Sequence, residues 1–413
     1  MNQASSSPRL FNKNLLLLII CQGLFLTNNV TFIAINGLVG MSLTPIPWMA
    51  TLPIMGYVVG GALSTGLVSK VQKRYGRQKS FQLGLLVAVV SAIICAIAAY
   101  QRNFWLLTTA TLIAGFYSAN GQLYRFAAAE LTHASLKEKA VSWVLAGGLL
   151  GAVIGPNLAS WTKNVFDVPF LGAYLSLAVA GTIGIFIMGK IEFHKELDLR
   201  QERDKDGGLV SGSVDVGRSL MVIAQQPMFI VVAMTSALSY GIMNLLMAAT
   251  PLAMEVCGYP FSDAAMVLQW HVIGMFAPGF FTGHLIKRWG SLPIMWVGLV
   301  LNVACVAIAL SGTELHQFFW AMLVLGVGWN FLFTGATTLA LSTYLPAEKD
   351  KAQGLINFFV FSTMAITSLS SGALLTTQGW ALLNWVSIFP LFLTALGLFW
   401  LSRHLKRLAL VRI

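Results

Sequence analysis

The sequence predicts an all-α membrane protein in which twelve transmembrane helices form two pseudo-symmetric six-helix bundles. Three observations support this fold class. Hydrophobic residues make up 57% of the 413-residue chain and charged residues only 10%, whereas a soluble domain carries about 25% charged residues. The apolar residues fall in twelve runs, each close to the roughly 20 residues that cross a bilayer as a helix. A short basic motif also occurs twice, half a chain apart.

The twelve apolar runs divide into two sets of six. We expect an N-terminal bundle at 1–189, a charged cytoplasmic linker at 190–218 and a C-terminal bundle at 219–413. The expected spans lie near 15–35, 47–68, 81–100, 104–129, 140–161, 170–189, 228–253, 262–286, 292–311, 317–342, 353–377 and 381–402. The first run is longer than a signal peptide and lacks a small-residue cleavage site, so we expect it to be retained as a helix.

The basic residues predict how the helices are oriented. If both termini are cytoplasmic, all but three of the 26 Lys and Arg residues fall in the termini, the linker or an inner loop. The exceptions are Arg102 and Lys163 in outer loops and Arg125 within a span. Inner loops of membrane proteins gather Lys and Arg. The net charge of +11 is therefore explained by membrane orientation, and no nucleic-acid partner is expected.

The basic motif at 73–76, Lys-Arg-Tyr-Gly, recurs as Lys-Arg-Trp-Gly at 287–290. A Lys-Ala pair at 139–140 recurs at 351–352 with nearly the same offset, as does Asn29 at Asn244. These repeats indicate a duplicated six-helix unit. Two repeats related by an axis along the membrane normal are typical of transporters whose substrate site lies between the halves near the bilayer midplane.

The basic motif resembles the signature G-x-L-x-D-R-x-G-R-[RK] of the major facilitator superfamily. Its positions are occupied here by Ser69, Val71, Lys73, Arg74, Gly76 and Arg77, and a weaker copy keeps Gly283, Leu285, Arg288 and Gly290. The resemblance covers nearly the whole chain and implies the major facilitator fold. Both copies carry Lys where the family has an Asp that helps to latch the cytoplasmic side, so that form of the latch is not expected.

Three further stretches extend the resemblance. Gly147, Gly151, Gly155 and Pro156 resemble the G-x-x-x-G-P pattern associated with exporters of the superfamily. The stretches at 269–283 and 326–333 are similar to a large bacterial subgroup, drug- or metabolite-exporter-like, mostly without an assigned substrate.

Nine residues are predicted to act in gating. They are Arg74, Gly76, Arg77, Gly151, Gly155, Pro156, Gly283, Arg288 and Gly290. Arg77 is expected to pair with Glu130 when the cytoplasmic side is closed, because Arg binds carboxylates with directional hydrogen bonds; the alternative is that the loop cations bind anionic lipid. Glycines four residues apart line one helix face and permit close packing. We expect that face to contact the span at 262–286 and to seal the extracellular side, or else to serve packing alone.

Nine polar residues are predicted to line a central cavity, because helices 1, 4, 7 and 10 line it in the family. They are Asn28, Asn29, Asn120, Gln122, Arg125, Tyr240, Asn244, Asn330 and Thr334. The alternative for each is a hydrogen bond between helices, and for Arg125 it is snorkelling to the interface. Trp270, Trp329, Phe331 and Phe333 are candidates for an aromatic wall.

Three groups are candidates for proton coupling: His271, Glu130 and Asp263. Histidine changes charge near neutral pH, although a single histidine in a span also serves as a hydrogen-bonding core residue. The sequence contains no Walker motif, so ATP is not the expected energy source. It contains no HExxH motif, no other cluster with metal-ligand spacing, and four isolated cysteines. We therefore expect neither an enzyme nor a metal or other cofactor.

The resemblance implies a monomeric secondary transporter of a small organic solute in the bacterial cytoplasmic (inner) membrane, working by alternating access. Proton-coupled efflux is the first interpretation. The alternatives are a proton symporter or facilitative importer of a metabolite or siderophore-like compound, and a transporter-like sensor without net flux. The expected partners are the solute, protons and the lipid bilayer.

Overall fold

The computed structural model describes residues 12–132, 137–193, 217–345 and 348–411. Most of the predicted linker lies outside these residues. The helices are α1 (Lys13–Leu43), η1 (Pro47–Met49), α2 (Leu52–Tyr75), α3 (Arg77–Tyr100), α4 (Phe104–Gly121), α5 (Tyr124–Glu130), α6 (Lys137–Thr162), α7 (Leu171–Gly189), α9 (Leu220–Ala224), α10 (Pro227–Val256), α11 (Phe261–Phe276), α12 (Gly279–Trp289), α13 (Ser291–Leu310), α14 (Leu315–Ala340) and α15 (Lys349–Val411). No strand occurs in the described ranges.

Ten helical segments of the described chain are long and apolar enough to cross a membrane. The apolar segment formed by α4 and α5 is not among them, and it is interrupted by a turn at Gln122 and Leu123. The long helix α15 is one of the ten, although Gly379 (φ 82°, ψ 177°) divides it with non-helical backbone. The described residues thus provide ten to twelve apolar helices.

The repeated basic motif forms the same turn twice. Gly76 (φ 81°, ψ 167°) separates α2 from α3, and Gly290 (φ 86°, ψ 161°) separates α12 from α13. Such positive φ values favour glycine, because it lacks a Cβ atom. In both copies the arginine two positions earlier lies over the ring of the next residue, at 5.2 and 5.4 Å from the ring centroid. The sequence repeat is therefore also a structural repeat.

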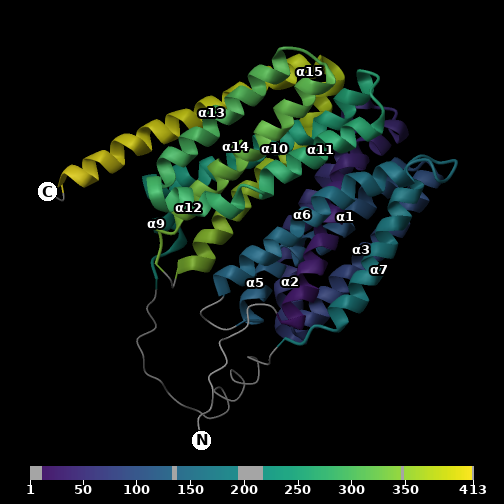
Figure 1. Ribbon diagram of the computed structural model, residues 1–413, viewed down its shortest axis with the longest axis horizontal. Coiled ribbons are helices and arrows are strands. Elements are labelled where there is room, and N and C mark those ends of the chain that lie inside the picture. The colour runs from purple at the N-terminus through teal and green to yellow at the C-terminus, as the bar shows by residue number, and fades with distance from the viewer. Residues whose placement is uncertain (1–11, 133–136, 194–216, 346–347, 412–413) are drawn as a thin grey trace, which may run out of the picture.

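The helix pairs repeat as well. In the N-terminal half (α1–α7), α1 packs on α6, α2 on α4 and α3 on α4. In the C-terminal half (α9–α15), α10 packs on α15, α11 on α14 and α13 on α14. Figure 1 shows the two halves side by side, the first in purple to blue and the second in green to yellow.

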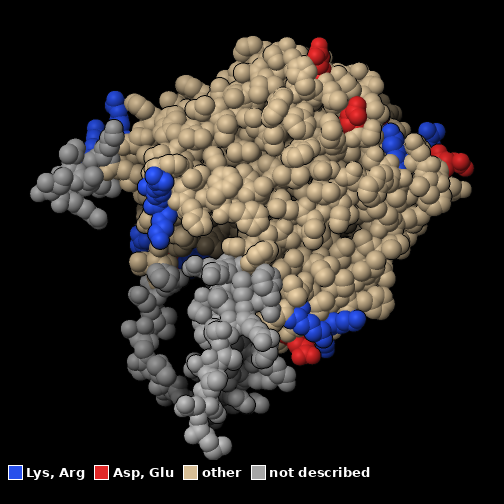
Figure 2. All heavy atoms as spheres, viewed as in Figure 1, with Lys and Arg blue, Asp and Glu red and all other residues tan. Residues whose placement is uncertain are grey.

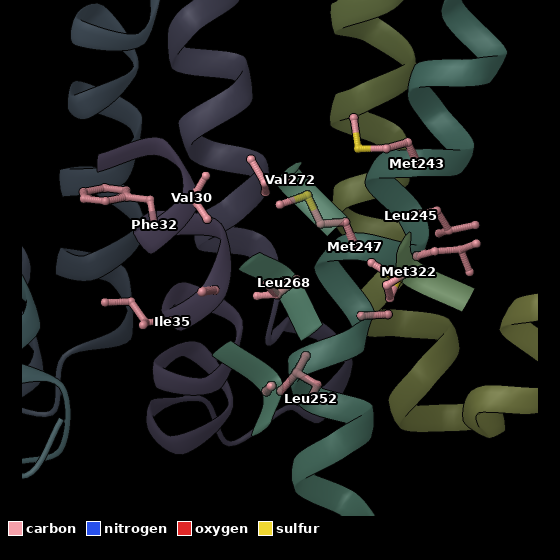
Figure 3. Close-up of a cluster of buried hydrophobic side chains, with 14 of the residues drawn as sticks. Val30, Phe32, Ile35, Met243, Leu245, Met247, Leu252, Leu268, Val272 and Met322 are labelled. Atoms are coloured by element: carbon pink, nitrogen blue, oxygen red, sulfur yellow. The ribbon is translucent and has the colours of Figure 1, made fainter. Parts of the chain in front are cut away.

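A buried apolar cluster joins the two halves. Val30 of α1 points toward Val272 of α11 and Met247 of α10 (Figure 3), and all three are at most 4% exposed. The outer surface is apolar too, since large hydrophobic side chains such as Phe186 and Phe389 are more than half exposed. Figure 2 shows a broad surface without charged side chains between charged ends. Such a surface is suited to contact with lipid.

Candidate functional site

The two halves contact each other at one end of the bundle and separate at the other. The far end contains Thr51, Lys163 and Phe261, and the basic end contains the Gly76 and Gly290 turns. The halves meet through α1 with α10, α2 with α15 and α6 with α11. At the basic end, α5 and α12 pack on helices of their own half, and Figure 2 shows a hollow near them. This conformation is therefore closed at the far end and open at the basic end.

Side-chain hydrogen bonds join the halves at two places of the far end, at Asn157 and at Thr51. Asn157 Nδ2 of α6 donates to Gln269 Oε1 of α11 over 2.6 Å. The backbone N–H of Gly372 in α15 donates to Thr51 Oγ1, immediately before α2, over 3.1 Å. Thr51 is completely buried, so this bond is shielded from water while the far end is closed.

A lysine between two aromatic rings adds a third contact at the far end. Phe170 of the N-terminal half and Phe261 of the C-terminal half meet edge to face, with ring centroids 5.0 Å apart. Lys163 Nζ lies 5.1 Å from the first ring and 5.6 Å from the second. A cation over aromatic faces attracts both rings. Opening the far end would have to break this contact.

Gly372→Ala is expected to shift the protein away from this conformation. A Cβ atom at position 372 would lie 2.9 Å from Thr51 Cγ2 and closer still to Thr51 Oγ1, which forces α2 and α15 apart. The measurement is the distance between spin labels at Trp161 and Val256, exposed at the far-end termini of α6 and α10. The label distance should lengthen, and adding Thr51→Ala should shorten it again because that change removes the clashing atoms. Unchanged distances in Gly372→Ala would show that this contact does not hold the far end closed.

At the basic end, Arg77 Nη2 of α3 lies 2.7 Å from Glu130 Oε1 at the end of α5. Both residues belong to the N-terminal half, and both side chains are partly exposed. The structure thus brings the predicted pair together while the halves are apart at this end. Closure of the basic end is not required for the pairing, and the pair ties the short helix α5 to the start of α3.

The glycine face of α6 packs on α1, against our expectation of α11. A Cβ atom at Gly147 would lie 2.6 Å from the carbonyl oxygen of Ile19, and one at Gly155 would lie 3.0 Å from that of Thr27. Thr31 Oγ1 of α1 also donates to the Gly155 carbonyl over 3.0 Å. The glycines therefore permit close packing within the N-terminal half, and another face of α6 meets α11.

The other predicted gating residues lie in turns, within helices or beside open space. Gly76 and Gly290 form the repeated turns, beside Arg74 and Arg288. Pro156 lies inside α6. Gly283 of α12 has no heavy atom within 4 Å of the position a Cβ atom would take, so no close packing requires a glycine there.

An aromatic cluster lies in the C-terminal half where it faces the N-terminal half. Tyr240 of α10 meets Trp329 and Phe333 of α14 edge to face, with centroids 5.0 and 5.1 Å away. The planes of Trp329 and Phe333 are nearly parallel, at 8°. Phe276, at the end of α11, lies 6.4 Å from Trp329 and also packs against the buried core of the N-terminal half. Of the four aromatic candidates from the sequence, Trp329 and Phe333 belong to this cluster.

Arg125 reaches this cluster from the opposite half. The turn at Gln122 and Leu123 places it in the first turn of α5. Its guanidinium lies 4.8 Å from the ring centroid of Phe126 and is close enough to Tyr240 to interact with it electrostatically. Its Nε is buried and has no hydrogen-bond partner among the described residues. Arg125 of the N-terminal half and Tyr240 of the C-terminal half are thus within electrostatic range of each other.

Three predicted cavity residues are instead bonded within their own half. Asn120 is fully buried and accepts a hydrogen bond from Ser80 Oγ over 2.9 Å. Asn244 donates to Ser368 Oγ over 2.8 Å, and Asn330 donates to the carbonyl of Met275 over 2.7 Å. In this conformation their amides hold helices together and are not available to a solute.

The remaining predicted cavity residues are placed differently from one another. Asn28 is buried and its Oδ1 has no partner in the part of the chain that the structure describes. Asn29 is half-buried, and its Nδ2 donates to Tyr57 Oη over 3.4 Å. Gln122 is exposed in the turn between α4 and α5. Thr334 is half-buried beside Phe333 on α14.

The three proton-coupling candidates do not come together. His271 is fully buried, with Nδ1 2.7 Å from the carbonyl oxygen of Met322 in α14. Asp263 lies in the first turn of the same helix, eight residues away and therefore about 12 Å along its axis. Glu130 lies in the other half beside Arg77. Within the described ranges, no three His, Cys, Asp or Glu side chains are placed to hold a metal ion.

Sequence reasoning missed two sets of residues. Nothing in the sequence distinguishes Phe276 from the other phenylalanines, of which the chain has 26 in all. The far-end contacts of Thr51, Asn157 and Gln269 were also missed. Lys163 was detectable, since a cation in an outer loop departs from the positive-inside pattern.

Two halves of membrane-length helices, closed at one end and open at the other around a polar and aromatic centre, define a membrane transporter. The chain belongs to the Major Facilitator Superfamily, whose family model matches residues 15–366 and 273–409. It is 37% identical over 380 residues to the riboflavin transporter RfnT of Brucella anthropi, covering 92% of this chain and 93% of that protein. The family and this relative are transporters and not enzymes.

Solved structures agree with this fold. A D-xylose–proton symporter matches with a TM-score of 0.74 and 12% identity, covering 93% of this chain and 96% of that one. The nucleoside transporter NupG matches with a TM-score of 0.69 and 12% identity, covering 94% and 99%. At such low identity the likeness concerns the fold alone.

Proposed function

We propose that this protein is a transporter of riboflavin or a closely related flavin. The observation that carries the proposal is the cluster of Tyr240, Trp329 and Phe333 opposite Arg125, in a chain 37% identical to a riboflavin transporter. A flavin is a flat tricyclic ring with two carbonyl groups and, in riboflavin, a polyol tail. Aromatic side chains stack on such rings, and an arginine donates hydrogen bonds to carbonyl oxygens.

The proposed architecture has twelve transmembrane helices, with Gly379 dividing α15 into the last two. The basic end would face the cytoplasm of a bacterium, because the Lys and Arg residues of the Gly76 and Gly290 turns gather there, as on cytoplasmic faces generally. The solute would enter from either side as the halves rock about the centre. The protein would act as a monomer, with the far-end contacts of Thr51 and Lys163 breaking when the outer side opens.

For direction and coupling we favour facilitated transport of the flavin over proton-driven efflux, our first interpretation of the sequence. The efflux interpretation rested on the glycines of α6, and these pack on α1. The proton-coupling candidates His271, Asp263 and Glu130 lie apart. The acidic side chains that the structure describes lie near helix ends or in loops. A gradient of the flavin itself is a sufficient driving force.

The test is riboflavin flux into liposomes that contain the purified protein, with protein-free liposomes as the control. We expect saturable, protein-dependent flux that is the same with and without an imposed pH gradient. Flux that depends on the gradient would overturn the facilitated mechanism and support proton coupling. Thermal stabilisation by riboflavin without any flux would favour the sensor alternative. Absence of both flux and stabilisation would overturn the flavin proposal.

A further inference from the structure

The aromatic cluster is flanked by two buried N–H groups without partners. Trp329 is 6% exposed, and its Nε1 has no hydrogen-bond acceptor among the described residues. Arg125 Nε is in the same situation. Trp329 contacts the ring of Tyr240, and Arg125 of the opposite half lies within electrostatic range of the same residue. Buried polar groups are rarely left unpaired, and an exception in a folded protein requires an explanation such as a missing ligand.

Both groups are hydrogen-bond donors, and this restricts the chemistry of a ligand that could bind to them. Indole and guanidinium nitrogens donate hydrogen bonds and cannot accept them. Their complement is a ligand edge that presents acceptors. The pyrimidine edge of a flavin presents two carbonyl oxygens and ring nitrogens, whereas its polyol tail presents hydroxyls that both donate and accept. The ring edge therefore matches these donors better than the tail does.

We propose that Arg125 and Trp329 are the specificity-determining residues of the solute site, and that they donate hydrogen bonds to the carbonyl edge of the flavin ring. This inference rests on the proposed function. The ring itself packs against the wall of Tyr240 and Phe333, whose planes meet at 84°. Aromatic faces and edges in this arrangement accept a further flat ring.

The placement of the two donors also couples binding to movement. Arg125 lies on α5 of the N-terminal half and Trp329 on α14 of the C-terminal half. A ligand edge held by both donors therefore bridges the halves. Since the halves are apart at the basic end, a flavin bound to both groups favours the approach of α5 to the C-terminal half. The same two contacts thus select the solute and draw the halves together.

The test is riboflavin binding to the purified full-length protein, followed by quenching of flavin fluorescence. Trp329→Phe keeps an aromatic ring but removes the donor, and Arg125→Lys keeps the charge but removes the planar donor group. Each variant is expected to bind riboflavin about tenfold more weakly, the usual effect of losing one hydrogen bond to a buried group. Trp320→Phe is the matched control, because Trp320 lies on the same helix but is 52% exposed. This variant should bind riboflavin with the same affinity as the unmodified protein.

A second probe separates hydrogen bonding from structural damage. Anthracene is a flat tricyclic ring without any hydrogen-bond acceptor, so its affinity should be the same in Trp329→Phe and in the unmodified protein. The ratio of riboflavin to anthracene affinity should fall about tenfold in this variant. If both donor variants bind riboflavin within about twofold of the unmodified protein, the inference is wrong while the flavin function stands. If the unmodified protein does not bind riboflavin, the inference fails together with the proposed function.

Discussion

Gly151→Ala should lower the Tm of the protein and the yield of monodisperse protein after extraction from the membrane. A Cβ atom at position 151 would lie 2.6 Å from the carbonyl oxygen of Gly23 and from the backbone nitrogen of Thr27, both in α1. Backbone atoms cannot rotate out of the way as a flexible side chain can. The added methyl group must therefore separate α1 from α6, and overpacking of this kind costs about 1–3 kcal/mol. Gly151→Leu should have a larger effect, because its side chain is bulkier.

The matched control is Gly283→Ala, in a second glycine that the sequence assigned to gating. No heavy atom lies within 4 Å of the position of its added Cβ atom. Its Tm and its transport rate should be close to those of the unmodified protein. A Gly151→Ala protein with unchanged Tm but no transport would contradict the packing explanation. It would show that α1 and α6 must slide past each other when the transporter changes conformation.

The α6 glycines illustrate which structural features a sequence can predict. Their four-residue spacing placed them correctly on one face, because helical periodicity is a local property. The same spacing does not say which helix that face will meet. That choice depends on how all the helices pack together, and α1 contacts the face where we had expected α11. The Gly76 and Gly290 turns were easier to predict, because the requirement for glycine at positive φ is also local.

The predicted cavity residues show where sequence reasoning stops. Asn120 and Arg125 are five residues apart on the same apolar segment, and nothing in the sequence separates their roles. In the structure Asn120 bonds to α3, and Arg125, beyond a turn in the helix, lies within electrostatic range of Tyr240 in the other half. The interruption at Gln122 and Leu123 changes which side chains face the centre. The sequence around a polar residue in an apolar segment is the same whether its side chain binds a solute or a neighbouring helix.

A second Arg–Glu pair at the basic end had no signal in the sequence. Arg218, where the described chain resumes before α9, forms two parallel hydrogen bonds of 2.8 Å with the carboxylate of Glu348. The backbone N–H of Arg218 and that of Leu345 donate to the same carboxylate over 2.6 and 2.9 Å. Glu348 is completely buried. The pair ties the start of the C-terminal half to the loop between α14 and α15, as Arg77 and Glu130 tie α3 to α5.

Glu348→Gln should destabilise the protein more than neutralisation of an exposed glutamate does. The amide cannot accept from all four donors, and it leaves the Arg218 guanidinium without its counter-charge. Removing one member of a buried pair is strongly destabilising for that reason. Glu192→Gln is the control, because Glu192 is exposed, and it should leave the Tm almost unchanged. The measurement is thermal unfolding in detergent at neutral pH.

The pH dependence of this difference in Tm gives a sharper test. The side-chain hydrogen bonds from Arg218 are the main cause that lowers the pKa of Glu348 from 4.5 to about 2. A depressed pKa means that folding favours the ionised carboxylate, so the stabilisation is complete above pH 4.5 and is lost as the pH falls towards 2. The Tm of the unmodified protein should therefore exceed that of Glu348→Gln by a constant amount near neutral pH, and the excess should shrink below pH 4.5. An excess that persists undiminished in acid would mean that the carboxylate charge is not what stabilises this loop.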